Sequence, residues 1–246
     1  MSFETLLLRP YWMVEHVIAP ELRYSQHFYE ESLRELVNSA TVWLDIGCGH
    51  QVLPEWRLQA ESELVNTASH VVGVDVDSAA LTEHRSIRDL KMGSVERLPF
   101  ADDSFNLVTA NMVVEHLENP VCAFREVRRV LRTGGVFLFH TPNLHGYITM
   151  VNRILPHRIS RFAAKLLDGR DSRDVYPAYY RCNLARIIRG VAVESQLDVK
   201  WIRHIPTTAV FARVLPLAVL ELLLIRATMR ESMAGFRTNL LCLLAK

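Results

Sequence analysis

Apolar residues cluster in two ways along residues 41–140, and the pattern predicts strands and helices in turn. Short runs rich in Val, Ile, Leu and Phe are typical of buried strands, whereas apolar residues that recur at every third or fourth position are typical of helices. The run Leu90–Met92 is weaker than the others. The expected strands are 41–46, 70–75, 90–92, 105–110 and 136–140.

Capping residues indicate where two of the intervening helices begin. Asp77 or Ser78 is expected to cap the helix that follows the second strand. Asn119 followed by Pro120 has the arrangement of an N-cap and a first helical residue, and Gly134-Gly135 is expected to end that helix. Strands that alternate with helices favour an α/β fold, in which a parallel sheet is covered on both faces.

The remaining chain carries further elements and no internal repeat. An amphipathic helix is expected over 21–38, before the first strand. The elements expected after the loosely patterned stretch to about Tyr180 are helix 183–195, strand 198–205, an apolar helical region near 209–230 and strand 236–245.

Composition narrows the class of protein. The chain has 246 residues, of which 50% are hydrophobic and 22% are charged, and this excludes wholesale disorder. The net charge of +1 does not indicate a nucleic-acid binder. Residues 1–150 carry −8 (12 basic, 20 acidic) and residues 151–246 carry +9 (16 basic, 7 acidic). That asymmetry fits an anionic substrate, a phosphate-bearing partner or a lipid surface, or charges that merely offset each other.

The sequence pattern does not indicate a signal peptide, a transmembrane helix or a metal site. The four cysteines form no CxxC, so reduced thiols and a cytoplasmic location are expected, with no metal site. Glu4, Arg9 and Pro10 make the N-terminus unlike a signal peptide. The apolar stretch 209–225 is interrupted by charged residues and proline, so a buried or interfacial helix is expected rather than a transmembrane one.

The candidate ligand-binding residues lie at the ends of the first two predicted strands. Asp45, Gly47 and Gly49 lie at the carboxyl end of that strand, where a doubly wound sheet binds its ligand. A dinucleotide fingerprint would place a third glycine where Val52 stands, so a nicotinamide-dependent oxidoreductase is a disfavoured alternative. The acid beside the glycines suits a cationic ligand. The second strand ends in Asp75, whose carboxylate could accept both hydroxyls of a ribose.

Five blocks in a fixed order resemble the class I S-adenosylmethionine-dependent methyltransferases, in particular the small-molecule branch that includes the ubiquinone-biosynthesis type. The resemblance covers roughly residues 40–143. The blocks are Val42-Trp-Leu-Asp-Ile-Gly-Cys-Gly49, Val72-Gly-Val-Asp-Val-Asp77, Leu98-Pro-Phe-Ala-Asp-Asp-Ser-Phe105, Val114-Glu-His-Leu117 and Val130-Leu-Arg-Thr-Gly-Gly-Val136.

The resemblance implies a doubly wound, Rossmann-like sheet of seven strands, in the order 3-2-1-4-5-7-6, with the last strand antiparallel and a helical cap. It implies one methyltransferase domain over 1–246. The parts would be an N-terminal helical segment 1–39, a cofactor-binding core 40–143, the acceptor-side cap and strand six 144–233, and the final strand 234–246.

The resemblance also implies how S-adenosylmethionine would be bound. The turn after the first strand would contact the methionine part, Asp75 would hold the ribose, Val76 would pack on the adenine, and the residues at 94 and 95 would flank its edge. Asn111 would face the methyl group. The implied cofactor-binding residues are Asp45, Gly47, Cys48, Gly49, His50, Asp75, Val76, Ser94, Val95, Asn111 and Met112.

Methyl transfer to a small-molecule or lipid-like acceptor is the implied reaction. A hydroxyl acceptor would need a base, and the candidates near strand ends are His116, His140 and His145, each of which could equally serve packing. Two departures from the family pattern support an alternative, a catalytically impaired binding or regulatory protein. Gln51 stands where a glycine is usual, and Ser94 stands where an acid often accepts from the adenine amino group.

The acceptor is expected to meet segments 144–182 and 206–233, which are rich in tyrosine and arginine. This composition suits an anionic, partly apolar molecule. Nucleic acid is not expected as a partner, peripheral membrane contact remains open, and the protein would be a monomer or a homodimer. The residues named for this surface are Tyr147, Arg153, Arg158, Tyr176, Tyr179, Tyr180 and Arg181.

Overall fold

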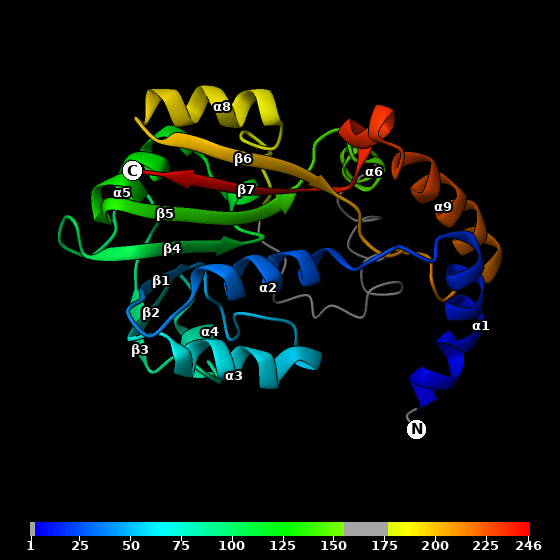
Figure 1. Cartoon of the computed structure of the whole chain (residues 1–246), viewed down its shortest axis with the longest axis horizontal. Coiled ribbons are helices and arrows are strands. Elements are labelled where there is room, and N and C mark those ends of the chain that lie inside the picture. The colour runs from blue at the N-terminus through cyan, green and yellow to red at the C-terminus, as the bar shows by residue number, and fades with distance from the viewer. Residues whose placement is uncertain (1–2, 155–176) are drawn as a thin grey trace. The chain divides into compact units, whose positions relative to one another are not determined.

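The fold is a seven-stranded mixed sheet flanked by helices, in a computed structural model that describes residues 3–154 and 177–246. The strand order is β3-β2-β1-β4-β5-β7-β6, as the sequence predicted (Figure 1). The strands are β1 (Val42–Ile46), β2 (His70–Asp75), β3 (Asp89–Met92), β4 (Phe105–Asn111), β5 (Leu131–Pro142), β6 (Asp198–Ile205) and β7 (Asn239–Ala245).

The first five strands are parallel, and β7 is antiparallel to β5. In β1, Asp45 pairs with Gly73 of β2 on one side and with Thr109 of β4 on the other. The backbone of Lys246 exchanges hydrogen bonds with Gly134 and Gly135, which fixes the direction of the last strand. The carboxyl ends of β1, β2, β4 and β5 therefore share one edge of the sheet.

The helices follow most of the predicted capping. Asp77 caps α4 by accepting from the amides of Ala79 and Ala80, and Asn119 caps α5 by accepting from Cys122, with Pro120 next. The helices are α1 (Phe3–Ile18), α2 (Ser25–Leu36), α3 (Leu58–Thr67), α4 (Ser78–Thr82), α5 (Pro120–Val130), α6 (Tyr147–Ile154), α8 (Ala185–Glu194) and α9 (Leu215–Thr228), with short 3-10 turns η1 (Glu55–Arg57), η2 (Val114–His116) and η4 (Glu231–Phe236).

One sequence-based expectation about a helix end was wrong. Helix α5 ends at Val130, and Gly134-Gly135 lies inside β5, where Gly134 has a φ of +80°. The glycines therefore shape the beginning of a strand rather than the end of a helix. At the N-terminus, α1 lies within the expected helical segment 1–39 and continues through Pro10. A proline removes one backbone donor but does not always end a helix.

Aromatic packing fills the space between α5 and β5. Phe124 of α5 meets Phe137 and Phe139 of β5, with ring centroids 5.4 and 5.6 Å away. All three side chains are buried, and so is Trp43 of β1. This core holds the central strands in register and so fixes the edge at which they end.

The chain divides into two compact units. We call residues 26–142, 178–203 and 240–246 the sheet unit, and residues 1–25, 143–177 and 204–239 the helical unit. In the described part of the helical unit, Tyr11 of α1 packs with Leu222 and Ile225 of α9, and Leu22, which follows α1, belongs to the same cluster. Among the described residues, no helix combines the length and the apolar character needed to cross a bilayer.

Candidate cofactor site

A tight turn follows β1 and depends on glycine. Gly47 and Gly49 have φ values of +63° and +51°, and the amides of Gly47 and Cys48 both donate to the carbonyl of Val74. A Cβ at position 47 would lie 2.4 Å from a methyl carbon of Val113, whereas one at position 49 would meet nothing within 4 Å. Position 47 thus excludes side chains, and position 49 leaves open space above the turn.

The carboxylate of Asp75 is held in place by this turn. One of its oxygens accepts from the amide of Gly49 at 2.8 Å, and the other accepts from the amide of Asp77 at 2.9 Å. Each carboxylate oxygen has two acceptor positions. Both oxygens of the half-buried side chain therefore keep capacity for a donor outside the protein, such as a sugar hydroxyl.

A cavity of about 290 Å³ opens beside the turn, in the sheet unit. Asp75, Glu96 and Glu118 bring three carboxylates to its walls. The volume is close to the lower limit of ordinary ligand pockets, ~300 Å³. The lining residues are Ile46, Gly47, Val74, Asp75, Val76, Gly93, Ser94, Val95, Glu96, Val113, His116, Leu117 and Glu118.

Six residues proposed from the sequence meet at this cavity. Ser94 lies at its wall, and the hydroxyl oxygen of that residue accepts from the amide of Glu96 at 3.3 Å. The six are Gly47, Asp75, Val76, Ser94, Val95 and His116. Sequence reasoning missed Glu96 and Glu118, although Glu96 lies shortly before the block that begins at Leu98 and Glu118 directly follows the block that ends at Leu117.

Asp45 does not line the cavity, and its side chain is buried. The indole of Trp43 donates to the hydroxyl of Thr109 at 2.6 Å, and that hydroxyl donates to Asp45 at 2.5 Å. Burial raises the pKa of Asp45 to about 7, opposed by the Thr109 hydrogen bond and assisted by the carboxylates of Glu61 and Asp75. Its charge therefore changes near neutral pH.

A second buried carboxylate fixes the chain that follows the glycine turn. Glu61 of α3 accepts from the amides of Val52 and Leu53 and from the guanidinium of Arg85, 2.9 Å away. Burial opposes the charge of Glu61, but the hydrogen bonds from Arg85, Ser86 and Leu53 outweigh it and lower the pKa. Nothing in the local sequence pattern indicated this role, since it depends on three separate segments.

Where β4 and β5 end, polar groups are bonded to one another. The amides of Gln26 and Asn111 exchange hydrogen bonds of 3.2 and 2.9 Å, and the oxygen of Asn111 also lies 2.9 Å from Nδ1 of His140. Burial lowers the pKa of His140 to about 4, so the ring is neutral at pH 7. With Nδ1 donating to Asn111, Nε2 is an acceptor, and it has no partner among the described residues.

The other proposed residues lie elsewhere. Cys48 is buried, and burial raises the pKa of its thiol. Met112 has a φ of +59° and donates its amide to His140. The residues that do not line the cavity are Asp45, Cys48, Gly49, His50, Asn111, Met112 and His140.

The three candidate bases are distributed over both units. His116 lines the cavity, with Nε2 at 4.0 Å from the carboxylate of Glu115. His140 is buried at the end of β5, and His145 belongs to the helical unit, where its ring lies 6.5 Å from that of Phe236.

The aromatic and basic residues expected on the acceptor side are described only in part. Tyr179 and Arg181 lie in the sheet unit beside Glu118, and Tyr147 is bonded to Glu221 in the helical unit. Arg158 and Tyr176 lie outside the described residues, as does the side chain of Arg153.

A family model, described as a methyltransferase domain, matches residues 44–139. A protein of Mycolicibacterium smegmatis named a probable S-adenosylmethionine-dependent methyltransferase is 34% identical over 103 residues, which are 41% of this chain and 37% of the relative. The demethylmenaquinone methyltransferase of Mycobacterium sp. strain KMS is 32% identical over 167 residues, 64% of this chain and 72% of the relative. The chain spans about a third of the length of the first curated relatives it matches.

Solved structures share the fold at low sequence identity. An S-adenosylmethionine-dependent methyltransferase from Mesorhizobium loti has a TM-score of 0.53 and 16% identity, covering 88% of this chain and 96% of its own. The [4+2]-cyclase SpnF has a TM-score of 0.56 and 16% identity, covering 89% and 80%. Because one neighbour is named a cyclase, the fold alone does not decide the reaction.

Proposed function

The chain belongs to the class I S-adenosylmethionine-dependent methyltransferases, and from this premise we propose that it transfers a methyl group from S-adenosylmethionine to a small-molecule or lipid-like acceptor. One observation carries the proposal. The glycine turn, the Asp75 carboxylate and the Ser94-Val95 segment border one cavity of about 290 Å³, although they come from three separate strand ends.

The residues at the cavity fit the charge of this cofactor. Asp75, Glu96 and Glu118 give its walls negative charge, which favours a sulfonium and an amino group over a pyrophosphate. The open space above Gly49 leaves room for a ligand to approach the backbone. A dinucleotide would instead need anion-binding glycines where His50, Gln51 and Val52 stand.

Each group has a distinct part in this proposal. Asp75 accepts hydrogen bonds from the ribose hydroxyls, while the amides of Gly49 and Asp77 keep its carboxylate oriented. Val76, which is exposed beside the cavity, packs on the adenine. Bound S-adenosylmethionine supplies an electrophilic methyl carbon on a sulfonium. The protein contributes position, which can supply up to ~7–11 kcal/mol in well-oriented reactions.

Three histidines remain candidates to take a proton from a hydroxyl acceptor, and one of them, His145, belongs to the helical unit. His116 borders the cavity, and His140 keeps an unprotonated Nε2 at pH 7 because Asn111 accepts from Nδ1. A lipid-like acceptor is supported by the similarity to a demethylmenaquinone methyltransferase over most of that relative's length. We place the reaction in the cytoplasm, since all four cysteines are free thiols.

The test is a turnover assay with the full chain and methyl-labelled S-adenosylmethionine. The acceptor panel should include reduced prenylated naphthoquinones and water-soluble hydroxyl and amine compounds. The proposal predicts one mole of S-adenosylhomocysteine for each mole of methylated product. Cofactor binding without product over the whole panel would instead support the impaired binding protein, and absence of cofactor binding would contradict both.

A further inference from the structure

Helix α9 has an apolar outer face that the described residues leave uncovered. Its inner face packs in the helical unit through Ala218, Leu222 and Ile225. The opposite positions are also apolar, and Leu220 and Leu223 are 64% and 51% exposed. Helices that are apolar on all sides are normally buried.

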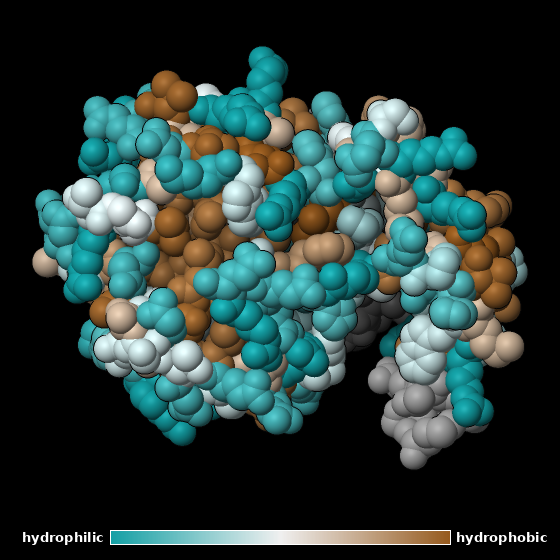
Figure 2. Space-filling model, viewed as in Figure 1, coloured by the Kyte–Doolittle hydropathy of each residue, from teal (hydrophilic) through white to brown (hydrophobic). Residues whose placement is uncertain are grey.

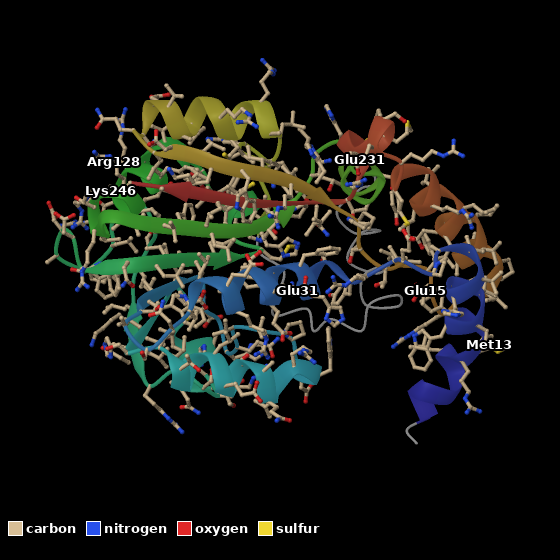
Figure 3. The ribbon with its side chains drawn as sticks, viewed as in Figure 1. Met13, Glu15, Glu31, Arg128, Glu231 and Lys246 are labelled. Carbon is tan, nitrogen blue, oxygen red and sulfur yellow. The ribbon has the colours of Figure 1, made fainter. Side chains whose placement is uncertain are left out.

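The exposed apolar surface is broader than this one helix. Figure 2 shows hydrophobic residues gathered over α9. On α1, which packs against α9, Met13 and Val17 are 72% and 75% exposed, and Met13 projects outward (Figure 3). The exposed apolar residues of the two helices are Trp12, Met13, Val17, Leu215, Leu217, Leu220, Leu223 and Leu224. Contiguous exposed patches of this kind mark protein or membrane contacts.

Two arginines lie beside the apolar residues at the end of α9. A depression of about 440 Å³ on the helical unit is lined by Leu223 and Met229 together with two arginines, Arg226 and Arg230. Arg226 donates to the carbonyl of Ile18 and remains exposed, whereas the guanidinium of Arg230 has no hydrogen-bond partner among the described residues.

The acid of α9 itself is withdrawn from this surface. Glu221, the one acid in α9, is buried and accepts from Tyr147 and from the amides of Val210 and Phe211. Glu231, which follows the helix, is exposed, and its carboxylate is paired with Arg237 at 2.6 Å. The outer face of α9 therefore presents leucine and arginine without an exposed carboxylate of its own.

We propose that the outer face of α9 docks the protein on an anionic lipid surface, with leucines entering the acyl region and arginines contacting lipid phosphates. A second copy of the chain is a poorer occupant. A two-fold contact through this face would place the arginines of both copies in one interface, where α9 has no exposed carboxylate to pair with them. The proposal concerns a surface of the helical unit, so it does not depend on the cofactor site.

The experiment is co-sedimentation of the full chain with vesicles of phosphatidylcholine alone or mixed with phosphatidylglycerol. We expect binding to the mixed vesicles that weakens as salt is raised. Leu220→Ser combined with Leu223→Ser should lower the partition coefficient at least about tenfold. Arg230→Gln should lower it about fivefold on mixed vesicles and leave it unchanged on phosphatidylcholine.

Helix α8 of the sheet unit offers matched controls. Val193 is 77% exposed there and Arg186 is exposed, so Val193→Ser and Arg186→Gln should leave vesicle binding unchanged. Because all five substituted positions are exposed, the variants should keep the circular dichroism and melting temperature of the wild type.

Three results would overturn the proposal. One is equal partitioning onto the two kinds of vesicle, and another is an α8 control that loses as much binding as the leucine variant. The third is a wild-type dimer in sedimentation velocity that becomes monomeric with the leucine pair substituted, because a second copy would then be the occupant.

Discussion

The carboxyl ends of β1 and β2 differ from those of β4 and β5 in the hydrogen bonds that their polar side chains make. Where β1 and β2 end, Asp75 and the glycine turn face a cavity, and the carboxylate keeps unused acceptor positions. Where β4 and β5 end, the side chains of Gln26, Asn111 and His140 bond to one another and are largely buried. The same edge is therefore open at one end and internally bonded at the other.

Asp45 of β1 and Asp75 of β2 differ in the same way, because one carboxylate is buried and the other faces the cavity. Asp45 pairs with Gly73, two residues before Asp75, and so lies deeper in the sheet. Its hydrogen bond comes from Thr109, and its pKa is raised to about 7 by burial. Because Asp45 lies two positions deeper in the sheet than Asp75, Asp45 is buried, whereas Asp75 can hold a ligand.

The largest effect is expected at the open end, from Gly47→Ala. A left-handed alanine and its contact with Val113 should together lower the free energy of unfolding by about 3 kcal/mol. Displacement of the turn should also abolish cofactor binding in calorimetry. The control is Gly190→Ala in α8, where the new methyl group meets open space and a helical alanine should raise stability by up to about 1 kcal/mol. Wild-type affinity in Gly47→Ala would contradict the role of the turn.

At the closed end, Asn111→Leu removes the partner shared by Gln26 and His140. Because both would be left buried without hydrogen bonds, urea denaturation should show a loss of about 2 kcal/mol. Adenosine affinity should not change, since Asn111 does not line the cavity. Asn66→Leu, on the exposed side of α3, should change stability by less than about 0.5 kcal/mol. Equal losses of stability in Asn111→Leu and Asn66→Leu would contradict the role of the hydrogen bonds that Asn111 makes.

Asp45 predicts a pH dependence of stability. The folded protein holds a proton on this group up to about pH 7, whereas an unfolded aspartate loses it near pH 3.9. Its contribution to the free energy of unfolding should therefore fall by about 2 kcal/mol as the pH rises from 5 to 7. Asp45→Asn should remove that component while still accepting from Thr109. Superimposable pH profiles of the two proteins would show that Asp45 is ionised throughout.

The smallest change is expected from Ser94→Asp, which introduces the acid that the family often has there. A charge-assisted bond to the adenine amino group should raise adenosine affinity about fivefold, or about 1 kcal/mol. Inosine lacks that amino group and should show no gain. Improvement for both nucleosides would mean that charge alone, and not contact with the amino group, is responsible.

The strands of the core could be predicted from sequence because each is a short apolar run between glycines or caps. Strands β2 and β6 begin and end at the predicted residues, and even the weak run at 90–92 is a strand. The fold and the family were also confirmed by comparison. Helix α1 was expected only as part of the helical segment 1–39, without bounds, because Pro10 interrupts its pattern; tertiary packing of Tyr11 against α9 stabilises it.

The sequence could predict only those site residues that lie at the carboxyl ends of strands. Alternation places Asp75 at a carboxyl edge, but the burial of Asp45 and the Glu61–Arg85 pair depend on contacts between distant segments. The roles of the three histidines remain predictions, since only His116 borders the cavity.

The most direct test compares S-adenosylmethionine binding to the wild type, Asp75→Asn and Asp89→Asn by calorimetry. Asp89 lies on neighbouring β3 and pairs with Lys91 and His70 away from the cavity, so its variant is the matched loss of one carboxylate. We predict that Asp75→Asn binds ~10- to 100-fold more weakly, because a charged acceptor of two hydroxyls is lost, while Asp89→Asn binds as the wild type does. Undiminished binding to Asp75→Asn, in a protein that melts at the wild-type temperature, would contradict the proposed cofactor site.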